Sequence, residues 1–377
     1  MTPASIQTRR DLARFLQAQM VASRLPWTPA ASPDEDEGEG ASGRTQVKTY
    51  LLEAHAHEGP TAEPLEFLRS IGSLLGLTVS ETKDGDLFRL EHSNGDDFWC
   101  DTSMGRFWRL YTTADVERTD RLRDELVAAS PWLDNVWLPP SVLENLPQQT
   151  RTELQTFSLS HDRRPLHRAD TPMPDVDYVS MRVWASRAAE TLAKLRRHEV
   201  FPRAVSIRSV RVRADADSGS EEFCVSEYFH HGKVTTTGNS FDVHTQLVVQ
   251  VVTFYRALVE RIESVFGLGY GSDRQGLIGN PIHIPVEWTS GDIEYAVSRM
   301  FSAAHPFRLW GLPEKVADSH YRARAVDLHV GQTFTVDVTP SYVTIHLPRG
   351  TCGNTVIRFL AALQFHVNSE TGKTLLQ

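Results

Sequence analysis

Residues 321–367 read YRARAVDLHVGQTFTVDVTPSYVTIHLPRGTCGNTVIRFLAALQFHV, and this stretch decides the fold class of the chain. Three short runs in it alternate apolar and polar residues: Tyr321–Leu328, Thr333–Val338 and Tyr342–Leu347. Such alternation predicts antiparallel strands with one buried face. A turn at Pro348–Asn354 follows, and helical apolar spacing then continues to Val367. The stretch therefore predicts a β-meander that packs on an amphipathic helix.

Two earlier parts of the chain repeat this order of short strands followed by a helix. In the first, Asn94-Gly95 lies between alternating runs, which is a strong hairpin signal. In the middle part we expect a long helix at Val179–His198, three strands, and a second helix at Phe241–Ser264 that begins after Ser240. The repeats share shape without a fixed period. The sequence therefore predicts an α+β protein of two to three domains, in which antiparallel meanders pack on amphipathic helices.

Composition shifts give the expected organisation along the chain. With 377 residues and about 150 residues per domain, two to three domains are expected. The segments are an N-terminal amphipathic helix at 1–26, an acidic flexible linker at 27–44, an N-terminal α+β domain at 45–147, a connector at 148–175, a middle α+β module with a basic helix and strand at 176–280, and a C-terminal α+β module at 281–377. A helix tethered by an acidic linker is either a docking arm for a partner or an edge helix that packs on its own domain.

Composition and charge place the chain among ordinary globular proteins. Hydrophobic residues make up 40% and charged residues 23%. The three cysteines lack a CxxC spacing, which argues against a disulfide framework or a thiolate zinc site. No apolar stretch is long enough for a signal peptide or a membrane span. A net charge of −9 opposes a general attraction to nucleic acid or anionic lipid. We therefore expect a cytoplasmic protein without a membrane contact.

One segment is basic although the whole chain is acidic. Between residues 182 and 213, the sequence contains nine basic residues and only two glutamates. A phosphate backbone binds such local stripes whatever the global charge. The alternatives are an acidic protein partner or a plain solvated face. The candidate contact residues are Arg182, Arg187, Arg196, Arg197, Arg208, Arg211 and Arg213.

The turn before the C-terminal helix is a candidate anion site. A helix N-terminus offers free N–H groups and a positive dipole end, which suit an anion. The residues are Arg349, Gly350, Gly353 and Asn354. The alternative is a glycine-rich turn that reverses the chain, with Asn354 as the helix N-cap.

The histidines give no metal signature, so no metal site and no cofactor is predicted. His230 and His231 are adjacent on an expected strand and point to opposite faces. His244 lies on the apolar face of its helix, where a core histidine is the simpler interpretation. His55 and His57 form a weak chelating pair close to the linker.

The sequence favours a non-catalytic role: a recognition or scaffolding subunit of an intracellular multi-protein assembly. Its partners would be other protein subunits, with DNA or RNA reached through the basic segment. The alternative is an enzyme of unfamiliar type, assembled around the turns of the C-terminal meander. The residues of that alternative site would be Asp327, His329, His346 and Arg349, with Asp101 and Arg106 second.

Overall fold

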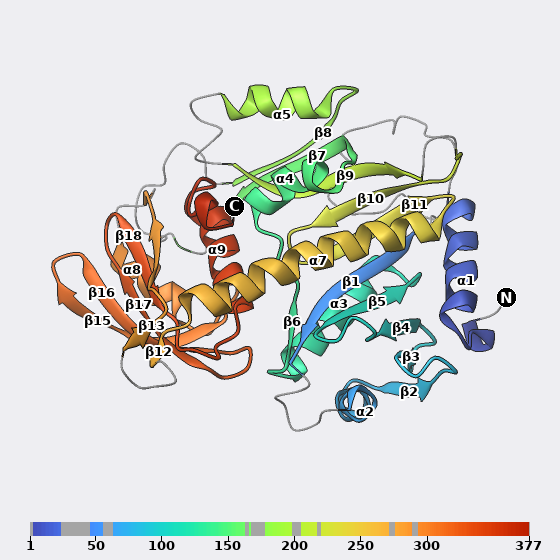
Figure 1. Ribbon diagram of the computed structural model, residues 1–377, viewed down its shortest axis with the longest axis horizontal. Coiled ribbons are helices and arrows are strands. Elements are labelled where there is room, and N and C mark those ends of the chain that lie inside the picture. Colours follow the sequence, from blue (N-terminus) through green and yellow to red (C-terminus); the bar gives the residue numbers. More distant parts are fainter. Residues whose placement is uncertain are drawn as a thin grey trace.

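The computed structural model describes residues 3–23, 46–55, 63–162, 166, 178–197, 205–216, 220–270, 276–288 and 293–376. The expected acidic linker at 27–44, His57 and part of the expected connector lie outside these residues. Within them, helices combine with two large antiparallel sheets, which confirms the mixed α+β class (Figure 1).

Eleven strands form the larger sheet, in the order β2-β3-β4-β5-β1-β11-β10-β9-β7-β8, and β6 pairs with β1. Its strands are β1 Val47–Ala54, β2 Leu77–Glu81, β3 Leu87–His92, β4 Asp97–Asp101, β5 Phe107–Thr112, β6 Leu133–Asn135, β7 Glu153–Asp162, β8 Tyr178–Trp184, β9 Ser206–Asp215, β10 Phe223–Phe229 and β11 Lys233–Gly238. Because β1 pairs antiparallel with both β5 and β11, one sheet runs through the two segments that were expected to form the first two modules.

The first meander, β2 to β5, follows the prediction. The hairpin between β3 and β4 turns at Asn94-Gly95, where Gly95 has a φ of +89° that suits glycine. Helices α2 (Pro64–Leu74) and α3 (Val116–Ala129) cover one face of this half of the sheet, where Phe67 and Leu122 join a core with Trp108. These two helices form a layer on that face of the sheet.

Helix α1 (Arg9–Ala22), preceded by the 3₁₀ turn η1 (Pro3–Ser5), packs on the other face. Its apolar stripe is buried, and the Phe15 ring lies 5.5 Å from the Trp99 ring. Arg9 adds an ion pair of 3.1 Å to Asp101 on β4. These contacts favour an edge helix that packs on its own domain over a free docking arm.

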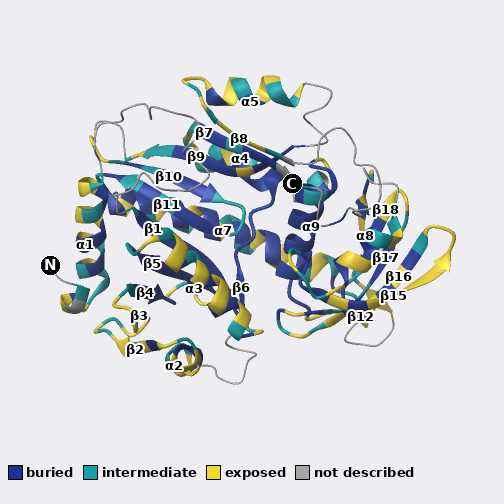
Figure 2. Cartoon of the chain, turned by 180° about the vertical axis from the view of Figure 1, so that it is seen from behind, coloured by how far each residue is buried: buried dark blue, intermediate teal, exposed yellow. Residues whose placement is uncertain are grey.

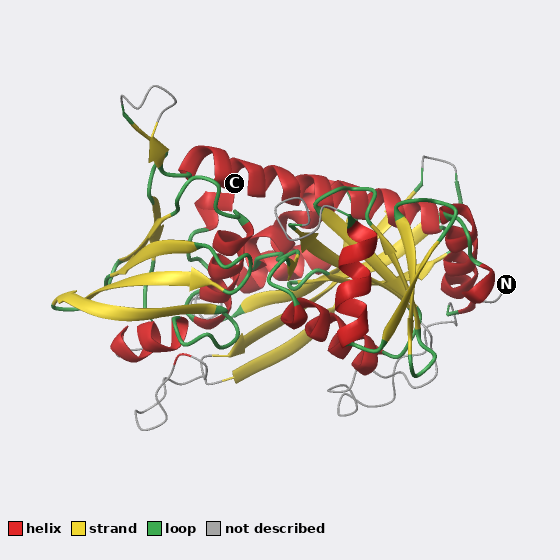
Figure 3. Cartoon of the chain, turned by 90° about the horizontal axis from the view of Figure 1, so that it is seen from below, coloured by secondary structure: helices red, strands yellow, loops and turns green. Residues whose placement is uncertain are grey.

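Helix α7 (Phe241–Phe266) runs along the same face of the sheet and on towards the C-terminal module (Figure 3). The hydroxyl of Ser240 accepts a hydrogen bond of 3.4 Å from the Val243 N–H, so the expected N-cap is confirmed. His244 is fully buried on the apolar side of α7 and lies 3.0 Å from the Thr49 hydroxyl, which confirms a core histidine.

The prediction of one long helix at Val179–His198 is wrong for the first half of that segment. This segment forms strand β8 followed by α5 (Ala188–Arg196). Val179, Met181 and Val183 are half-buried while the residues between them are exposed, which is the two-residue period of a strand. Strand pairing of β8 with β7 therefore outweighs the helical spacing that continues into α5.

The C-terminal meander is confirmed. Five strands pair antiparallel in the order β14-β18-β17-β16-β15. They are β14 Ile282–Pro285, β15 Leu309–Ala317, β16 His320–Asp327, β17 Thr333–Val338 and β18 Tyr342–His346. A short pair, β12 Gly269–Tyr270 and β13 Leu277–Ile278, follows α7, and α8 (Ile293–Met300) packs near β15.

Helix α9 (Asn354–His366) lies between the two sheets, next to α4 (Pro140–Thr150), and the 3₁₀ turn η4 (Lys373–Leu376) follows it. Every residue of α9 from Asn354 to Phe365 is buried, whereas α5 buries only Ala188 and Leu192 (Figure 2). One hydrophobic core accordingly continues from α1 through α7 and α9 into the smaller sheet. The domain boundaries expected from the sequence stay a prediction. None of the helices in the described ranges is long and apolar enough to cross a bilayer.

Candidate metal centre

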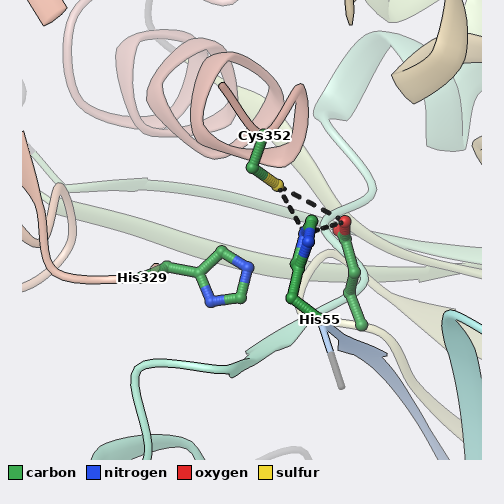
Figure 4. A group of neighbouring side chains, drawn as sticks. His55, His329 and Cys352 are labelled. Carbon is green, nitrogen blue, oxygen red and sulfur yellow. Dashed lines mark hydrogen bonds and ion pairs between the residues drawn. The ribbon is translucent and has the colours of Figure 1, made fainter. Parts of the chain in front are cut away.

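Four buried side chains converge where the larger sheet meets the C-terminal module. They are Glu53 and His55 at the end of β1, His329 in the turn between β16 and β17, and Cys352 before α9. Their donor atoms all lie within 4.8 Å of one another, and no residue of the four is more than 4% exposed. Figure 4 shows His55 and Cys352 pointing toward each other, with the ring of His329 beside them. We call these four residues the donor cluster.

Strand β1 places the first two donors. It is paired with β5, β11 and β6, so it lies inside the sheet. Because side chains two residues apart on a strand share a face, Glu53 and His55 point the same way. The N–H of His55 donates a hydrogen bond of 2.9 Å to the Trp132 carbonyl. This bond continues the pairing of β1 with the neighbouring chain by one residue, as far as His55.

A strained turn places His329. Val330 and Gly331 both have left-handed backbone angles, with φ of +58° and +67°. For a β-branched residue this conformation costs about 1–3 kcal/mol and persists only when its surroundings enforce it. Here the Val330 N–H donates to the Pro131 carbonyl at 2.6 Å, and the His329 N–H donates to Asp327 Oδ1 at 3.0 Å. These bonds hold the turn in the conformation that brings His329 to the donor cluster.

The loop before α9 places Cys352 against α7. The Cys352 N–H donates to Gln332 Oε1 at 2.9 Å, and the Gly353 N–H donates to Glu263 Oε1 at 2.9 Å. A Cβ on Gly353 would lie 2.7 Å from the Val259 carbonyl oxygen, so only glycine permits this close approach. The backbone at Cys352 and Gly353 is therefore held in place against α7.

The contacts of His55 Nε2 exceed what one ring nitrogen can satisfy. This atom lies 3.1 Å from Glu53 Oε1, 3.0 Å from Cys352 Sγ and 3.0 Å from Arg106 Nη2. A ring nitrogen has either one N–H or one lone pair, so only one of these three contacts is a full hydrogen bond. Donor atoms that crowd together in this way are typical of groups that share a cation.

The ring of His329 has no hydrogen-bond partner on either nitrogen among the described residues, although it is fully buried. Glu53 Oε2 likewise lacks a partner there. Leaving a buried polar group without a partner costs about 1–3 kcal/mol, so native structures rarely do so without a reason. Because the His329 ring lies 5.2 Å from the His55 ring, its nitrogens are within reach of an ion held by the other donors.

Arg106 and Glu263 form an ion pair in contact with the donor cluster. Arg106 precedes β5 and donates from Nε to Glu53 Oε1 at 2.6 Å and from Nη2 to Cys352 Sγ at 3.1 Å. It also binds both carboxylate oxygens of Glu263, at 2.8 and 3.2 Å. The side chains of Arg106 and Glu263 are 18% and 28% exposed, whereas Glu53 is fully buried. Among the described residues that contact Glu53, this ion pair therefore gives the cluster a partly exposed neighbour.

Electrostatics keep Glu53 charged and Cys352 protonated. Burial opposes the ionisation of Glu53, but the hydrogen bond with His55 and the charge of Arg106 outweigh it and lower the pKa of the carboxyl. Burial, together with the charge of Glu53, raises the pKa of the Cys352 thiol well above its ordinary value. Burial also lowers the pKa of His329, so its ring is neutral and has a lone pair to give.

A second buried network supports the donor cluster. Arg358 on α9 pairs with both Asp134 and Asp327, which are fully buried. Burial opposes the ionisation of Asp134, but Arg358 and other cations hold its pKa at about 2. Asp327 also accepts the N–H of His329, so the network ties α9, β6 and the His329 turn together.

The geometry favours metal binding over nucleophilic catalysis. In a cysteine–histidine–carboxylate triad the carboxylate binds the histidine nitrogen that faces away from the nucleophile. Here Glu53 and Cys352 approach the same atom, His55 Nε2, and the thiol is protonated and buried. Cysteine, histidine and carboxylate are the usual zinc ligands. In a tetrahedral zinc site with bonds of about 2.0–2.3 Å, neighbouring ligand atoms lie about 3.3–3.8 Å apart.

The observed separations are close to that spacing. Glu53 Oε1 lies 3.4 Å from Cys352 Sγ, and both lie about as far from His55 Nε2, at 3.1 and 3.0 Å. Outward movements of a few tenths of an ångström would bring these three atoms to that spacing, and a nitrogen of His329 lies within 4.8 Å of each of them.

The basic residues predicted from the sequence lie elsewhere, on β8, α5 and β9. Four of them pair with nearby acids: Arg182 with Glu227, Arg187 with Glu190 at 3.5 Å, Arg196 with Glu144 at 3.2 Å, and Arg213 with Asp215 at 2.7 Å. Arg197 and Arg208 are exposed, and Arg211 is half-buried. Much of the positive charge in this segment is thus balanced locally.

The predicted anion site is partly filled by the protein itself. The N–H groups of Cys352 and Gly353 already donate to Gln332 and Glu263, so a carboxylate occupies the start of α9. Arg349 and Gly350 are exposed. The expected N-cap is wrong: Gly353 is the cap, and the Asn354 side chain instead accepts the Tyr255 hydroxyl at 2.6 Å.

Of the residues in the alternative enzyme site, the structure brings some together. His329 belongs to the donor cluster, Arg106 touches it, and Asp327 lies beside it. His346 instead pairs with Asp337 on the outer face of the smaller sheet, and Asp101 pairs with Arg109 near α1.

Sequence reasoning missed Glu53, His55 and Cys352 as one group. Cys352 is 297 residues from His55, and no local motif connects them. The weak signal was a carboxylate and a histidine two residues apart at the end of a strand.

The comparisons with known proteins match a protein family. A family model described as "MJECL33-like protein" matches residues 1–373. The chain is also 25% identical over 360 residues to "Uncharacterized protein MJECL33" of Methanocaldococcus jannaschii, which covers 86% of this chain and 85% of that protein. No solved structure matches the chain.

Proposed function

We propose that this chain, which belongs to the MJECL33-like protein family, binds a divalent transition-metal ion between Glu53, His55, His329 and Cys352. The ion would join the end of β1 to the C-terminal module. One observation carries the proposal: a fully buried His329 ring with no hydrogen-bond partner on either nitrogen among the described residues, beside three crowded donor atoms.

The charges of the region support a divalent ion. Glu53 and Glu263 contribute two negative charges, and Arg106 contributes one positive charge. Cys352 would bind a metal as the thiolate and add a third negative charge. A divalent ion then brings the sum to zero. The neighbouring network of Asp134, Asp327, Arg308 and Arg358 has equal numbers of acids and arginines and needs no further charge.

The closed geometry supports a structural role for the ion. Structural zinc sites take four protein ligands, whereas catalytic sites keep one position for water or substrate. The donor cluster supplies four ligands, and all four side chains are buried in the described part of the chain. A thiolate with two imidazoles favours zinc, with iron(II) as the next choice.

Metal analysis of the purified chain tests the proposal. We expect about one equivalent of zinc or iron per chain, and a thiolate-to-cobalt charge-transfer band when Co²⁺ replaces it. His329→Ala and Cys352→Ala should lower the affinity for Co²⁺ at least 100-fold, since even outer partners of metal ligands contribute 10–100-fold.

Matched controls separate ligand loss from damage to the core. Cys224→Ala also removes a buried thiol, and His283→Ala removes an exposed histidine on β14. Both should keep the metal and the cobalt band. Equal metal content in Cys352→Ala and the parent chain, or a cobalt spectrum without a thiolate band, would overturn the proposal.

The recognition role expected from the basic segment stays a prediction. The exposed Arg208 supports it, while the local pairing of Arg182 and Arg213 weakens it. Binding to short DNA and RNA at two salt concentrations, compared with an Arg208/Arg211/Arg213→Ala variant, is the measurement that decides it.

A further inference from the structure

Arg106 Nη2 reaches the same donor atoms that a metal ion would use. It lies 3.0 Å from His55 Nε2 and 3.1 Å from Cys352 Sγ, and it forms an ion pair with Glu53 Oε1. A terminal guanidinium nitrogen has two N–H groups, so it cannot donate fully to all of these and to Glu263 as well. The guanidinium therefore stands where an incoming cation would be coordinated.

We propose that Arg106 is a displaceable internal cation, which holds the donor cluster together without metal and withdraws onto Glu263 when an ion enters. This inference rests on the proposed metal function. Two like-charged cations cannot share the three donor atoms at hydrogen-bond distance, so one has to leave. Arg106 thereby sets both the affinity and the rate of metal uptake.

The withdrawn position already exists. Glu263 on α7 binds the guanidinium through both carboxylate oxygens, and it is the most exposed member of the group. The Arg106 carbonyl accepts the Ala54 N–H at 2.7 Å, so its backbone is fixed and only the side chain has to move. The movement would carry the guanidinium from the buried donors towards the more exposed Glu263.

If Arg106 is displaced by the metal, its removal should lower the stability of the metal-free protein and raise its affinity for Co²⁺. In Arg106→Gln, Glu53 and Glu263 lose their shared cation, so the metal-free protein should melt at a lower temperature. The same change removes the competitor, so Co²⁺ should bind at least tenfold more tightly or faster than to the parent chain. A purely structural arginine would lower both stability and affinity.

Arg109→Gln is the matched control. Arg109 is a buried arginine near the start of β5, where Arg106 is half-buried, and it pairs with Asp101 at 2.7 Å without touching the donor cluster. It should lower the melting temperature and leave Co²⁺ binding unchanged. Glu263→Gln removes the resting partner and should weaken Co²⁺ binding relative to the parent chain.

The outcomes separate this inference from the metal function. If the parent chain binds Co²⁺ and Arg106→Gln binds it equally or more weakly, displacement is wrong and the metal site stands. If Arg106→Gln binds Co²⁺ and the parent chain does not, Arg106 is a permanent occupant and the proposed function is wrong. If neither binds, both are overturned.

Discussion

Removing the guanidinium of Arg358 should destabilise the whole protein more than any other single arginine change in the C-terminal module. Arg358 is 1% exposed and lies between Asp134 and Asp327, both fully buried. In Arg358→Met, Asp327 keeps the Thr355 hydroxyl and the His329 N–H but loses its ion pair. Breaking a buried pair by removing one partner costs about 3–5 kcal/mol.

For 377 residues that unfold as one unit, this cost corresponds to a fall in melting temperature of about 4–6 °C. Thermal unfolding followed by circular dichroism measures it. Arg324→Met, an exposed arginine on β16, is the control and should stay within about 0.5 kcal/mol of the parent chain. Adding Asp327→Asn to Arg358→Met should recover part of the loss, because contacting residues couple by about 0.5–3 kcal/mol. A fall no larger than that of Arg324→Met would refute the reasoning.

Three further predictions concern the backbone and the N-terminal helix. Val330→Gly should raise the free energy of unfolding by about 1 kcal/mol, because glycine adopts its positive φ without strain; urea unfolding checks this. Gly238→Ala should destabilise by more than about 1 kcal/mol, because its φ is +141° and a Cβ would lie 2.5 Å from a backbone oxygen of β10; the urea midpoint again reports it. Burial raises the pKa of Asp101, but the hydrogen bond from Arg9 and the charge of Arg109 outweigh it, so its pKa is below the ordinary value. Its stabilisation is therefore present above the unfolded pKa of about 3.9 and lost as pH falls through the lower folded value. Asp101→Asn should abolish that part of the acid dependence, and equal acid melting curves for the two proteins would contradict it.

Local patterns predicted most of the elements. The alternation in Tyr321–Leu328 and the N-cap at Ser240 depend on neighbours in the sequence, so they could be read directly. The segment Tyr178–Trp184 could not: it alternates like a strand, but helical apolar spacing continues from it into α5, and only its pairing with β7 decides for the strand. Packing also decides between the two interpretations of the N-terminal helix: the contact of Phe15 with Trp99 exists only in the folded chain.

The donor cluster could not be predicted because its chemistry is non-local. Glu53 and Cys352 are separated by 299 residues, and each alone is an ordinary buried residue. His329 was noticed only as one of several polar residues near the meander turns. The position of β1 between β5 and β11, together with the burial of α9, brings the four side chains to one place.

The separation of the donors has a consequence for biosynthesis. A ribosome adds about 5–20 residues per second, so Cys352 is made about 15–60 s after His55, 297 residues earlier. Late in that interval β1 and α7 have both been synthesised, whereas α9, which fills the space between the sheets, has not. A nascent chain would therefore expose the apolar surfaces that later enclose α9, and chaperone binding to stalled intermediates should peak before this helix emerges. A metal ion bound by all four donors, as proposed above, would have to enter after this helix emerges.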